Sequence, residues 1–498
     1  MSPLISAQRR VFSGTLALLS LSFVALASRV KMDCKALAVA FPQITYLPST
    51  PQYENSTCSY FAAFENEIHP SCVITPRSTQ EVADVIKSLQ QAPASLKIAI
   101  RGGGHTPWAG AANINAGVTI DMRQLNGVSV DAKNVVSIAA GNSWGDVYTK
   151  LQTKGLAVVG GRVSKVGVTG LTIGGGLSYF SETRGFVCDS VVNFEVVLSS
   201  GKIVQANANT NPDLYRALKG GTNNFGVVTR FELPSFQQGN MWGGVLYYPS
   251  TTYAEIVDKL YNFASPAQPD PNAHLIVATA YSPAGSVNVV NAYYTKPTPN
   301  PPSLAPFVAV QPQLAQTLRE DSLLGFASEQ SSFSTNGDRQ LFFTTTIKLN
   351  KQLLLDMEKL FHDTIEGVKT VPGLTISMVF QPLTKHILQQ SALQGPNVLG
   401  LSPERGPLLI TLLNSVHTNA ADDAKVIAAV TDLLSKIEEL ARQRGLGERY
   451  KFLNYAYKTE TPIQSYGPEN VKFLQTVSKK YDPSGFFQSS VPGGFKLP

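Results

Sequence analysis

Clusters of charge and groups of metal-binding side chains are scarce in this sequence. The 498 residues include six histidines and four cysteines, and the histidines have neither paired spacing nor nearby cysteines, so no metal site is expected. The formal net charge of +6 is spread along the chain, and the pair Lys479-Lys480 is too short to form a nucleic-acid-binding surface. A Gly-x-Ser-x-Gly motif, the mark of a hydrolase nucleophile, is also missing. The sequence therefore predicts neither a nucleic-acid partner nor a metal centre.

Long hydrophobic runs are limited to the N-terminus. Arg9-Arg10 precede an apolar stretch, residues 11–27, which ends in the small residues of Ala25-Leu26-Ala27. This order of charged, apolar and small residues predicts a cleaved secretory signal peptide at residues 1–27. An uncleaved anchor is the alternative, because the stretch is only just shorter than the ~20 residues that span a bilayer. Because no other segment is long enough to span, we expect a secreted protein without stable membrane association.

The few cysteines are unevenly placed, which suits an exported chain. Cys34, Cys58 and Cys72 lie close together after the predicted signal peptide, whereas Cys188 stands alone. One N-terminal disulfide is therefore expected, and its pairing is open. The sequon Asn55-Ser56-Thr57 lies among proline, tyrosine and polar residues, where we expect a surface loop that is N-glycosylated at Asn55.

The length of the chain favours two domains, because single hydrophobic cores stop growing near ~250 to 300 residues. A capping pair, Ser78 with Glu81, starts an amphipathic helix that leads to the apolar strand of residues 98–100. A hairpin is expected over residues 191–206, and a helix starts at Pro212. Composition changes near Pro234, which suggests a domain boundary.

Beyond that boundary, the pattern predicts a sheet with helices on one face. Strands are expected at residues 275–281, 287–294, 341–349 and 374–379, and long helices at residues 353–365 and 420–442.

Two glycine-rich segments carry the clearest functional signal. Arg101-Gly102-Gly103-Gly104-His105-Thr106 directly follows a buried strand, and a second cluster lies in a glycine-dense loop predicted from Gly155 to Gly176. Glycine lets the backbone approach a ligand closely and present N–H groups to an anion. Taken alone, the first segment has an ordinary alternative, a turn with an exposed histidine. Two such loops in one domain indicate a long, phosphate-bearing ligand, and their spacing is that of neither a Rossmann motif nor a P-loop.

Further motifs occur in the order and spacing of a known family. They are Arg101-Gly-Gly-Gly-His105, Val166-Gly-Val-Thr-Gly170 with Gly174-Gly-Gly176, Cys188-Asp-Ser-Val191, Gly220-Gly-Thr-Asn-Asn-Phe-Gly-Val-Val228 and Lys480-Tyr-Asp-Pro483. With them the chain resembles the FAD-linked oxidases with a PCMH-type (vanillyl-alcohol-oxidase-like) FAD-binding domain, particularly the berberine-bridge-enzyme-like group. The resemblance implies an α+β fold with a two-subdomain FAD-binding domain at residues 28–235 and a substrate domain at residues 236–450, whose antiparallel sheet is backed by helices. Residues 451–498 would return to the FAD domain.

The resemblance also implies the cofactor site. His105 would be bonded to the 8α-methyl carbon of FAD. Val163 stands where doubly attached members have a cysteine, which implies a single bond. A small residue at the position of Val166 goes with reaction with O2 in this family. The other FAD contacts that the motifs imply are Arg101, Gly102, Gly103, Gly104, Thr106, Gly110, Val166, Gly167, Gly170, Gly174, Gly175, Gly176, Ser178, Gly226, Val228 and Asn454.

Two residues outside the glycine loops are candidate catalytic groups. Asn454-Tyr455 resembles the family's Asn-Tyr pair, whose tyrosine acts as a base in several members. A phenol needs a nearby positive charge or a hydrogen bond to its oxyanion for that role. The usual acidic residue two positions later is Tyr457 here, so an ordinary core tyrosine is the alternative. Gln381 ends a strand and either faces the flavin or is a polar residue of an edge strand.

The resemblance predicts an oxidase that takes a hydride from a small organic substrate and passes electrons to O2. Aromatic pairs such as Phe342-Phe343 and Tyr293-Tyr294 favour an apolar secondary metabolite, with cyclisation or C=C formation as outcomes. The alternatives are a carbohydrate or alcohol oxidase, a dehydrogenase with another electron acceptor, and a redox-silent FAD-containing cyclase or binding protein.

Overall fold

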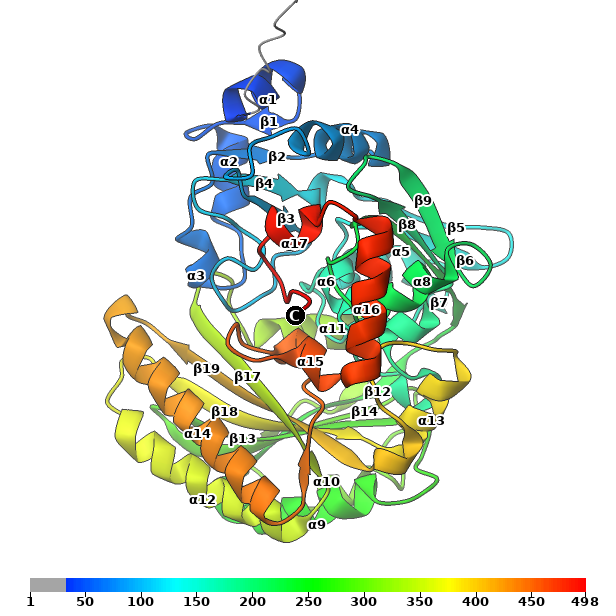
Figure 1. The fold of residues 1–498 in the computed structure, drawn as a ribbon. Helices are drawn as coiled ribbons and strands as arrows, with labels where there is room; N and C mark the ends of the chain where they lie inside the picture. The colour runs from blue at the N-terminus through cyan, green and yellow to red at the C-terminus, as the bar shows by residue number, and fades with distance from the viewer. Residues whose placement is uncertain (1–32) are drawn as a thin grey trace, which may run out of the picture. The chain divides into compact units, whose positions relative to one another are not determined.

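The computed structural model describes residues 33–498, so the predicted signal peptide lies outside the described residues. Within residues 33–498 the strands form a four-stranded, a five-stranded, a two-stranded and a nine-stranded sheet, with helices packed around them (Figure 1). This mixture of helices and largely antiparallel sheets confirms the predicted α+β class. No helix of residues 33–498 combines the length and the apolar character needed to cross a bilayer.

The four-stranded sheet carries the first glycine loop. Its strands, in spatial order, are β1 (Thr45–Tyr46), β2 (Cys72–Ile74), β4 (Val118–Asp121) and β3 (Ile98–Arg101). β2, β4 and β3 are parallel, because helix α4 (Thr79–Leu89) carries the chain back between β2 and β3. The glycine loop therefore starts at the carboxyl end of β3, at the edge where loops of parallel sheets bind ligands.

The start of α4 confirms half of the predicted capping box. The Ser78 hydroxyl accepts a hydrogen bond of 3.2 Å from the Glu81 N–H. The prediction of the reciprocal bond, from the Ser78 N–H to Glu81, is wrong. The Glu81 carboxylate instead accepts a hydrogen bond of 2.6 Å from the Arg77 N–H. The carboxylate is thus displaced by one residue along the backbone and still satisfies a free N–H at the helix end.

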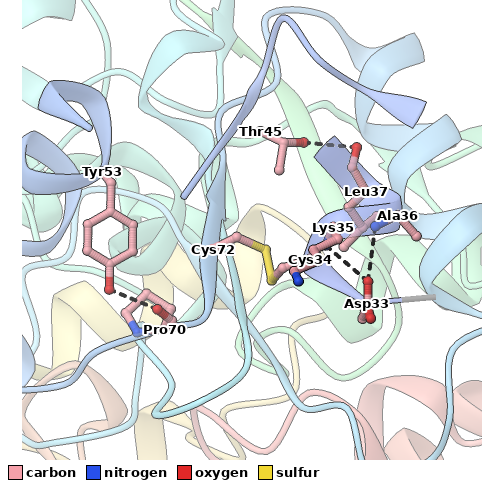
Figure 2. The surroundings of a disulfide bond; sticks show 9 residues. All are labelled: Asp33, Cys34, Lys35, Ala36, Leu37, Thr45, Tyr53, Pro70 and Cys72. Carbon is pink, nitrogen blue, oxygen red and sulfur yellow. Dashed lines mark hydrogen bonds between the residues drawn. A yellow bond between two sulfur atoms is a disulfide. The ribbon is translucent and has the colours of Figure 1, made fainter. Parts of the chain in front are cut away.

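The expected N-terminal disulfide is present and joins Cys34 to Cys72, with the two Cα atoms 5.8 Å apart. Figure 2 shows that it ties helix α1 (Cys34–Ala40) to β2, beside the Asp33 carboxylate that caps the helix. Asp33 accepts hydrogen bonds of 3.0 Å from the N–H groups of both Lys35 and Ala36. Cys58 and Cys188 are free, the first exposed and the second buried.

The sequon does not lie in a loop as expected. Asn55 is exposed on helix α2 (Pro51–Thr57). The signal for a helix was in the sequence, because Thr50 caps it and Pro51 occupies the first turn, where proline is favoured.

The five-stranded sheet is antiparallel and follows the first sheet in the chain. Its strands, in spatial order, are β5 (Val128–Val130), β6 (Val135–Ala139), β10 (Val227–Pro234), β8 (Asn193–Val197) and β9 (Ile203–Asn207). β8 and β9 form the predicted hairpin, and α8 (Pro212–Leu218) begins at the predicted proline. The expectation of one long glycine-dense loop before them is wrong, because the segment contains the short helix α6 (Val168–Ile173).

The nine-stranded antiparallel sheet forms most of the second half. Its order is β15 (Ala315–Gln316), β12 (Met241–Pro249), β14 (Gly285–Tyr294), β13 (Ala273–Ser282), β18 (Thr375–Leu383), β19 (Leu408–His417), β17 (Arg339–Lys348) and β20 (Gly447–Glu448), with β16 (Arg319–Asp321) also paired to β12. Helices α9 (Tyr253–Ala264), α12 (Lys351–Val368) and α14 (Asp423–Gln443) lie together along one side of this sheet (Figure 1). Phe343 and Leu413 pack in the core that these helices cover. Because side chains alternate along a strand, Phe342 and Asn414 face the opposite way.

The C-terminal segment lies against the first half of the chain. Helix α16 (Pro468–Tyr481) packs on α8, and the Asp482 carboxylate accepts hydrogen bonds from the N–H groups of Phe486 and Phe487. The Ile98 N–H, at the start of β3, donates to the Ser490 carbonyl at 2.8 Å. The domain limits themselves stay a prediction. The remaining elements used below are α5 (Trp144–Gln152), α7 (Ser181–Arg184), α11 (Leu323–Ser332), α13 (Lys385–Leu393) and the short helix η6 (Leu453–Tyr455).

Candidate active site

A cavity of about 430 Å³ lies between the two glycine loops and the open face of the nine-stranded sheet. A volume of this size is typical of a site for a cofactor or a drug-sized molecule. The predicted site residues that line it are Gly102, Gly103, Gly104, His105, Thr106, Val166, Gly167, Gly170, Gly226, Val228, Asn454 and Tyr455. Most of the predicted site residues therefore line the cavity, and they form the part of its wall that the glycine loops and the C-terminal segment contribute.

The two glycine loops touch backbone to backbone at Gly103 and Gly167. A Cβ atom on Gly103 would lie 2.6 Å from the Gly167 Cα, and one on Gly167 would lie 2.5 Å from the Gly103 nitrogen. Both distances are shorter than any side chain tolerates, so only glycine allows this contact. Gly170, also in the wall, has open space in the direction of a Cβ. The result is a cradle of bare backbone, which suits the pyrophosphate of a dinucleotide such as FAD.

Arg101 was expected to contact the cofactor, but its side chain turns away from the cavity. It is fully buried and donates hydrogen bonds to the carbonyl groups of Ser56 and Ser59. Its guanidinium lies 3.6 Å from the ring centre of Tyr60 and 3.8 Å from the Asp121 carboxylate. Arg101 therefore anchors the start of the glycine loop to the segment of Ser56 and Ser59, on the side away from the cavity.

His105 lies at the end of the first loop and is stacked on Phe61. The ring centres are 3.8 Å apart and the planes differ by 18°. Burial lowers the pKa of His105 to about 4, and the charge of Lys165 acts in the same direction. The imidazole is therefore neutral near pH 7 and keeps one ring nitrogen with a free lone pair. Val163 lines the same cavity.

Asn454 connects the C-terminal segment to the second glycine loop. Its carbonyl oxygen accepts from the Gly176 N–H at 3.1 Å, and its amide group donates to the carbonyl groups of Gly170 and Leu171. Asn454 thus fixes the loop at both ends of its turn.

Several predicted cofactor or catalytic residues lie outside the cavity lining. They are Arg101, Gly110, Gly174, Gly175, Gly176, Ser178 and Gln381. Gly175 and Gly176 have φ angles of +114° and +73°, so they make the turn after α6 that only glycine adopts easily. The Ser178 N–H donates to the Ser181 hydroxyl at the start of α7. In the second glycine segment, these residues therefore shape the backbone of the loop and do not themselves line the cavity.

Tyr455 is the centre of a polar cluster that the sequence revealed only in part. Arg162 donates to the Tyr455 hydroxyl oxygen at 3.0 Å, and the Gln381 amide donates to the same oxygen at 2.9 Å. Arg162 also donates to the Gln381 carbonyl oxygen at 2.7 Å. The three residues come from the second glycine segment, β18 and η6, and close a triangle of hydrogen bonds. The sequence analysis did not identify Arg162 as a site residue, although its position directly after Gly160-Gly161 in the glycine-rich segment pointed to the site.

His274 on β13 completes the support of Arg162. Its Nε2 atom lies 3.1 Å from an Arg162 Nη atom. Burial lowers the pKa of His274 well below its usual value, and the Arg162 charge adds to this. The imidazole is therefore neutral and accepts this hydrogen bond through Nε2. Arg162 is held between His274 on one side and Gln381 with Tyr455 on the other.

Aromatic and aliphatic side chains form the rest of the wall. Phe342 on β17 has its ring centre 5.8 Å from Phe61 and 6.0 Å from Tyr455. The predicted aromatic pair Phe342-Phe343 is thus split, because Phe343 faces the helices and stacks on Tyr457 at 4.3 Å. Tyr293 is buried against Tyr179 and does not line the cavity.

Comparison with known proteins identifies FAD as the cofactor of this part of the chain. A family model described as an FAD binding domain matches residues 70–207. The chain is 37% identical over 452 residues to the FAD-dependent monooxygenase tpcD of Cochliobolus heterostrophus, an alignment that covers 88% of this chain and 87% of the relative. It is 30% identical over 469 residues to the bifunctional solanapyrone synthase of Alternaria solani, covering 94% and 89%.

Solved structures share the fold at lower identity. Physcomitrella patens BBE-like 1 superposes with a TM-score of 0.74 at 18% identity, over 94% of this chain and 100% of the other. The glucooligosaccharide oxidase of Acremonium strictum, described with a 6-S-cysteinyl, 8α-N1-histidyl FAD, has a TM-score of 0.74 at 19% identity, over 91% and 97%. The chain shares its fold with these structures, and its relatives at 30% to 37% identity show that it belongs to the FAD-dependent oxidoreductases with a PCMH-type FAD-binding domain.

Proposed function

We propose that the chain is an O2-dependent oxidase that holds FAD through one bond to His105 and oxidises a small, largely apolar secondary metabolite. The observation that carries this proposal is the shared cavity, in which the cradle of glycine backbone and the Tyr455–Arg162 pair face one space. When bound, FAD supplies the hydride acceptor. The relatives named as a monooxygenase and as solanapyrone synthase support a role in secondary metabolism.

The attachment to His105 is supported by the state of its ring. A neutral imidazole is a nucleophile, whereas an imidazolium is not, and burial keeps His105 neutral at the pH of most cells. Phe61 fixes the ring plane by stacking. Val163 offers no sulfur for a second bond, unlike the cysteinyl link described for the Acremonium strictum oxidase.

We assign the role of general base to Tyr455. As a phenolate, Tyr455 would accept the proton of a substrate O–H group and become a neutral phenol, as the hydrogen of the neighbouring C–H bond leaves as hydride. The hydrogen bonds from Arg162 and Gln381 stabilise the charge on that oxygen, which replaces the acidic residue absent at Tyr457. Gln381 would then act as a positioning residue, since it touches Tyr455 and Arg162 but does not line the cavity.

We propose O2 as the electron acceptor, supported by the small side chain of Val166 in the cavity wall. The holoenzyme, reduced with dithionite without air, should reoxidise within seconds of mixing with aerated buffer and release peroxide. Reoxidation only by an artificial acceptor such as a quinone would instead identify a dehydrogenase.

We propose that the protein is exported, with cleavage after Ala27 and glycosylation of Asn55. The Cys34–Cys72 disulfide and the exposed position of Asn55 support this. N-terminal sequencing and N-glycosidase treatment of protein from a eukaryotic culture medium test it, and an unprocessed, unglycosylated chain inside the cells would contradict it.

The variant His105→Ala tests the attachment. After acid precipitation, the flavin colour and fluorescence should stay with the parent polypeptide and be absent from the variant, which loses the only proposed bond. His69→Ala, which changes an exposed histidine, serves as the control and should keep its flavin. Flavin that stays bound to the denatured His105→Ala polypeptide would contradict the proposal.

The variant Tyr455→Phe tests the base. It should retain flavin, while the rate of flavin bleaching by substrate without air falls by about 10² to 10⁴, the usual contribution of general base catalysis. Tyr457→Phe is the matched control, because that ring packs on Phe343 outside the cavity, and its rate should not change. An unchanged rate in Tyr455→Phe removes this residue as the base, and absence of bleaching with any substrate favours the redox-silent alternative.

A further inference from the structure

The cavity contains a second polar pair that the proposed chemistry does not use. Gln340 on β17 and Asn414 on β19 both line it. Asn414 pairs with Phe342 across the two strands, and Gln340 pairs with Val416. Residues that pair across strands, and residues two apart on one strand, share a face, so Gln340, Phe342 and Asn414 point the same way.

Each of these carboxamides has an oxygen atom without a partner. Gln340 is fully buried, and its amide group donates to the carbonyl groups of Phe61 at 3.2 Å and Thr335 at 2.7 Å. Because both partners are carbonyl groups, the atom that faces them must be the Gln340 nitrogen. The other atom of the carboxamide, Oε1, is buried and unpaired. Oδ1 of Asn414 is also buried and unpaired. A buried polar atom without a partner is costly and rare in proteins, so two in one cavity wall call for a ligand.

The two carboxamides differ in what they offer to a ligand. Gln340 has both amide hydrogens engaged, so it has only an acceptor left. Asn414 is half-buried and makes no side-chain hydrogen bond within residues 33–498, so its carboxamide is free to donate as well as accept. The ligand group that matches a pair of this kind is a hydroxyl, which donates one hydrogen bond and accepts others.

The surroundings define the rest of the ligand. Phe342 separates this pair from the Tyr455 hydroxyl, and Phe61 and Leu412 extend the apolar wall. Aromatic side chains of this kind favour a flat, apolar ligand body, and the polar groups on the two sides of Phe342 favour oxygen substituents on it.

We propose that Gln340 and Asn414 form a subsite for a hydroxyl group of an aromatic substrate that carries a second hydroxyl, on a side-chain carbon with a C–H bond, near Tyr455. This inference rests on the proposed function, because it takes the cavity as the substrate site. It names the substrate class as hydroxylated aromatic metabolites, and it makes Asn414 a specificity-determining residue.

The first test compares hydroxyl groups with methyl ethers. Isothermal calorimetry on the flavin-loaded protein is run with a panel of dihydroxynaphthalenes and with the dimethyl ether of each. Methylation removes the donor and leaves the acceptors of the subsite unpaired. At least one dihydroxynaphthalene should therefore bind about tenfold or more tightly than its ether. No preference for the hydroxyl form in any pair, which includes no binding of either form, would overturn the subsite.

The variant Asn414→Leu tests whether the preference for hydroxyl groups arises at Asn414. Leucine has nearly the volume of asparagine and removes an unpaired polar group, so the thermal midpoint should rise. The preference for the hydroxyl form should shrink to the part that the hydroxyl near Tyr455 contributes. Ser415→Ala is the matched control, because it also removes a buried, unpaired oxygen, one residue along β19 and on the opposite face. It should raise the midpoint and keep the full preference. An unchanged preference in Asn414→Leu would overturn the assignment.

Flavin content measured in the same samples distinguishes a failure of the proposed function from a failure of the subsite. A parent protein that holds no flavin would contradict the proposed function. A parent that holds flavin but does not prefer the hydroxylated probes would contradict the subsite alone.

Discussion

The contact between Gly103 and Gly167 is the constraint on which the site depends. It brings the loop after β3 against the loop before α6 with no side chain between them, at a separation that a single methyl group would prevent. Because the loops meet here, His105 on one and Arg162 on the other face a common cavity. Arg101 fixes the first loop from behind, and Asn454 fixes the second through its backbone. The site is thus built on a backbone contact that requires glycine at both positions.

The hydrogen-bonded cluster around Tyr455 needs all three parts of the chain. Arg162 comes from the glycine segment, Gln381 from the nine-stranded sheet, and Tyr455 from the segment that follows it. A guanidinium is planar and carries a positive charge, so it can support negative charge on the Tyr455 oxygen, whose hydrogen-bond partners within residues 33–498 are Arg162 and Gln381. The same sheet contributes Gln340 and Asn414 at a different place in the cavity. In the proposed assignment most cofactor contacts come from the first half of the chain and the substrate subsite comes from the second, which is consistent with one FAD-binding fold serving many substrates.

Much of the cofactor half could be predicted from the sequence, because glycine clusters report directly on backbone shape. The direction of the Arg101 side chain could not, since it depends on Ser56, Ser59 and Tyr60, which no local pattern links to it. In the other half, β12 and β19 were not among the predicted strands. β12 contains Gly243-Gly244, and β19 is a run of leucine and isoleucine that gives no alternation. The pairing of Arg162 with Tyr455 spans 293 positions in the chain and is visible only in the fold.

The flavin-to-protein ratio of Gly167→Ala tests this account most directly. The added methyl group would lie 2.5 Å from the Gly103 nitrogen, so the loops must separate and the cradle must open. Gly127→Ala is the control, because a methyl group there meets no atom within 4 Å. The account predicts a folded Gly167→Ala protein with a small fraction of the parent's flavin, and a Gly127→Ala protein with all of it. Full flavin occupancy in Gly167→Ala would contradict the claim that backbone contact between the two loops builds the FAD site.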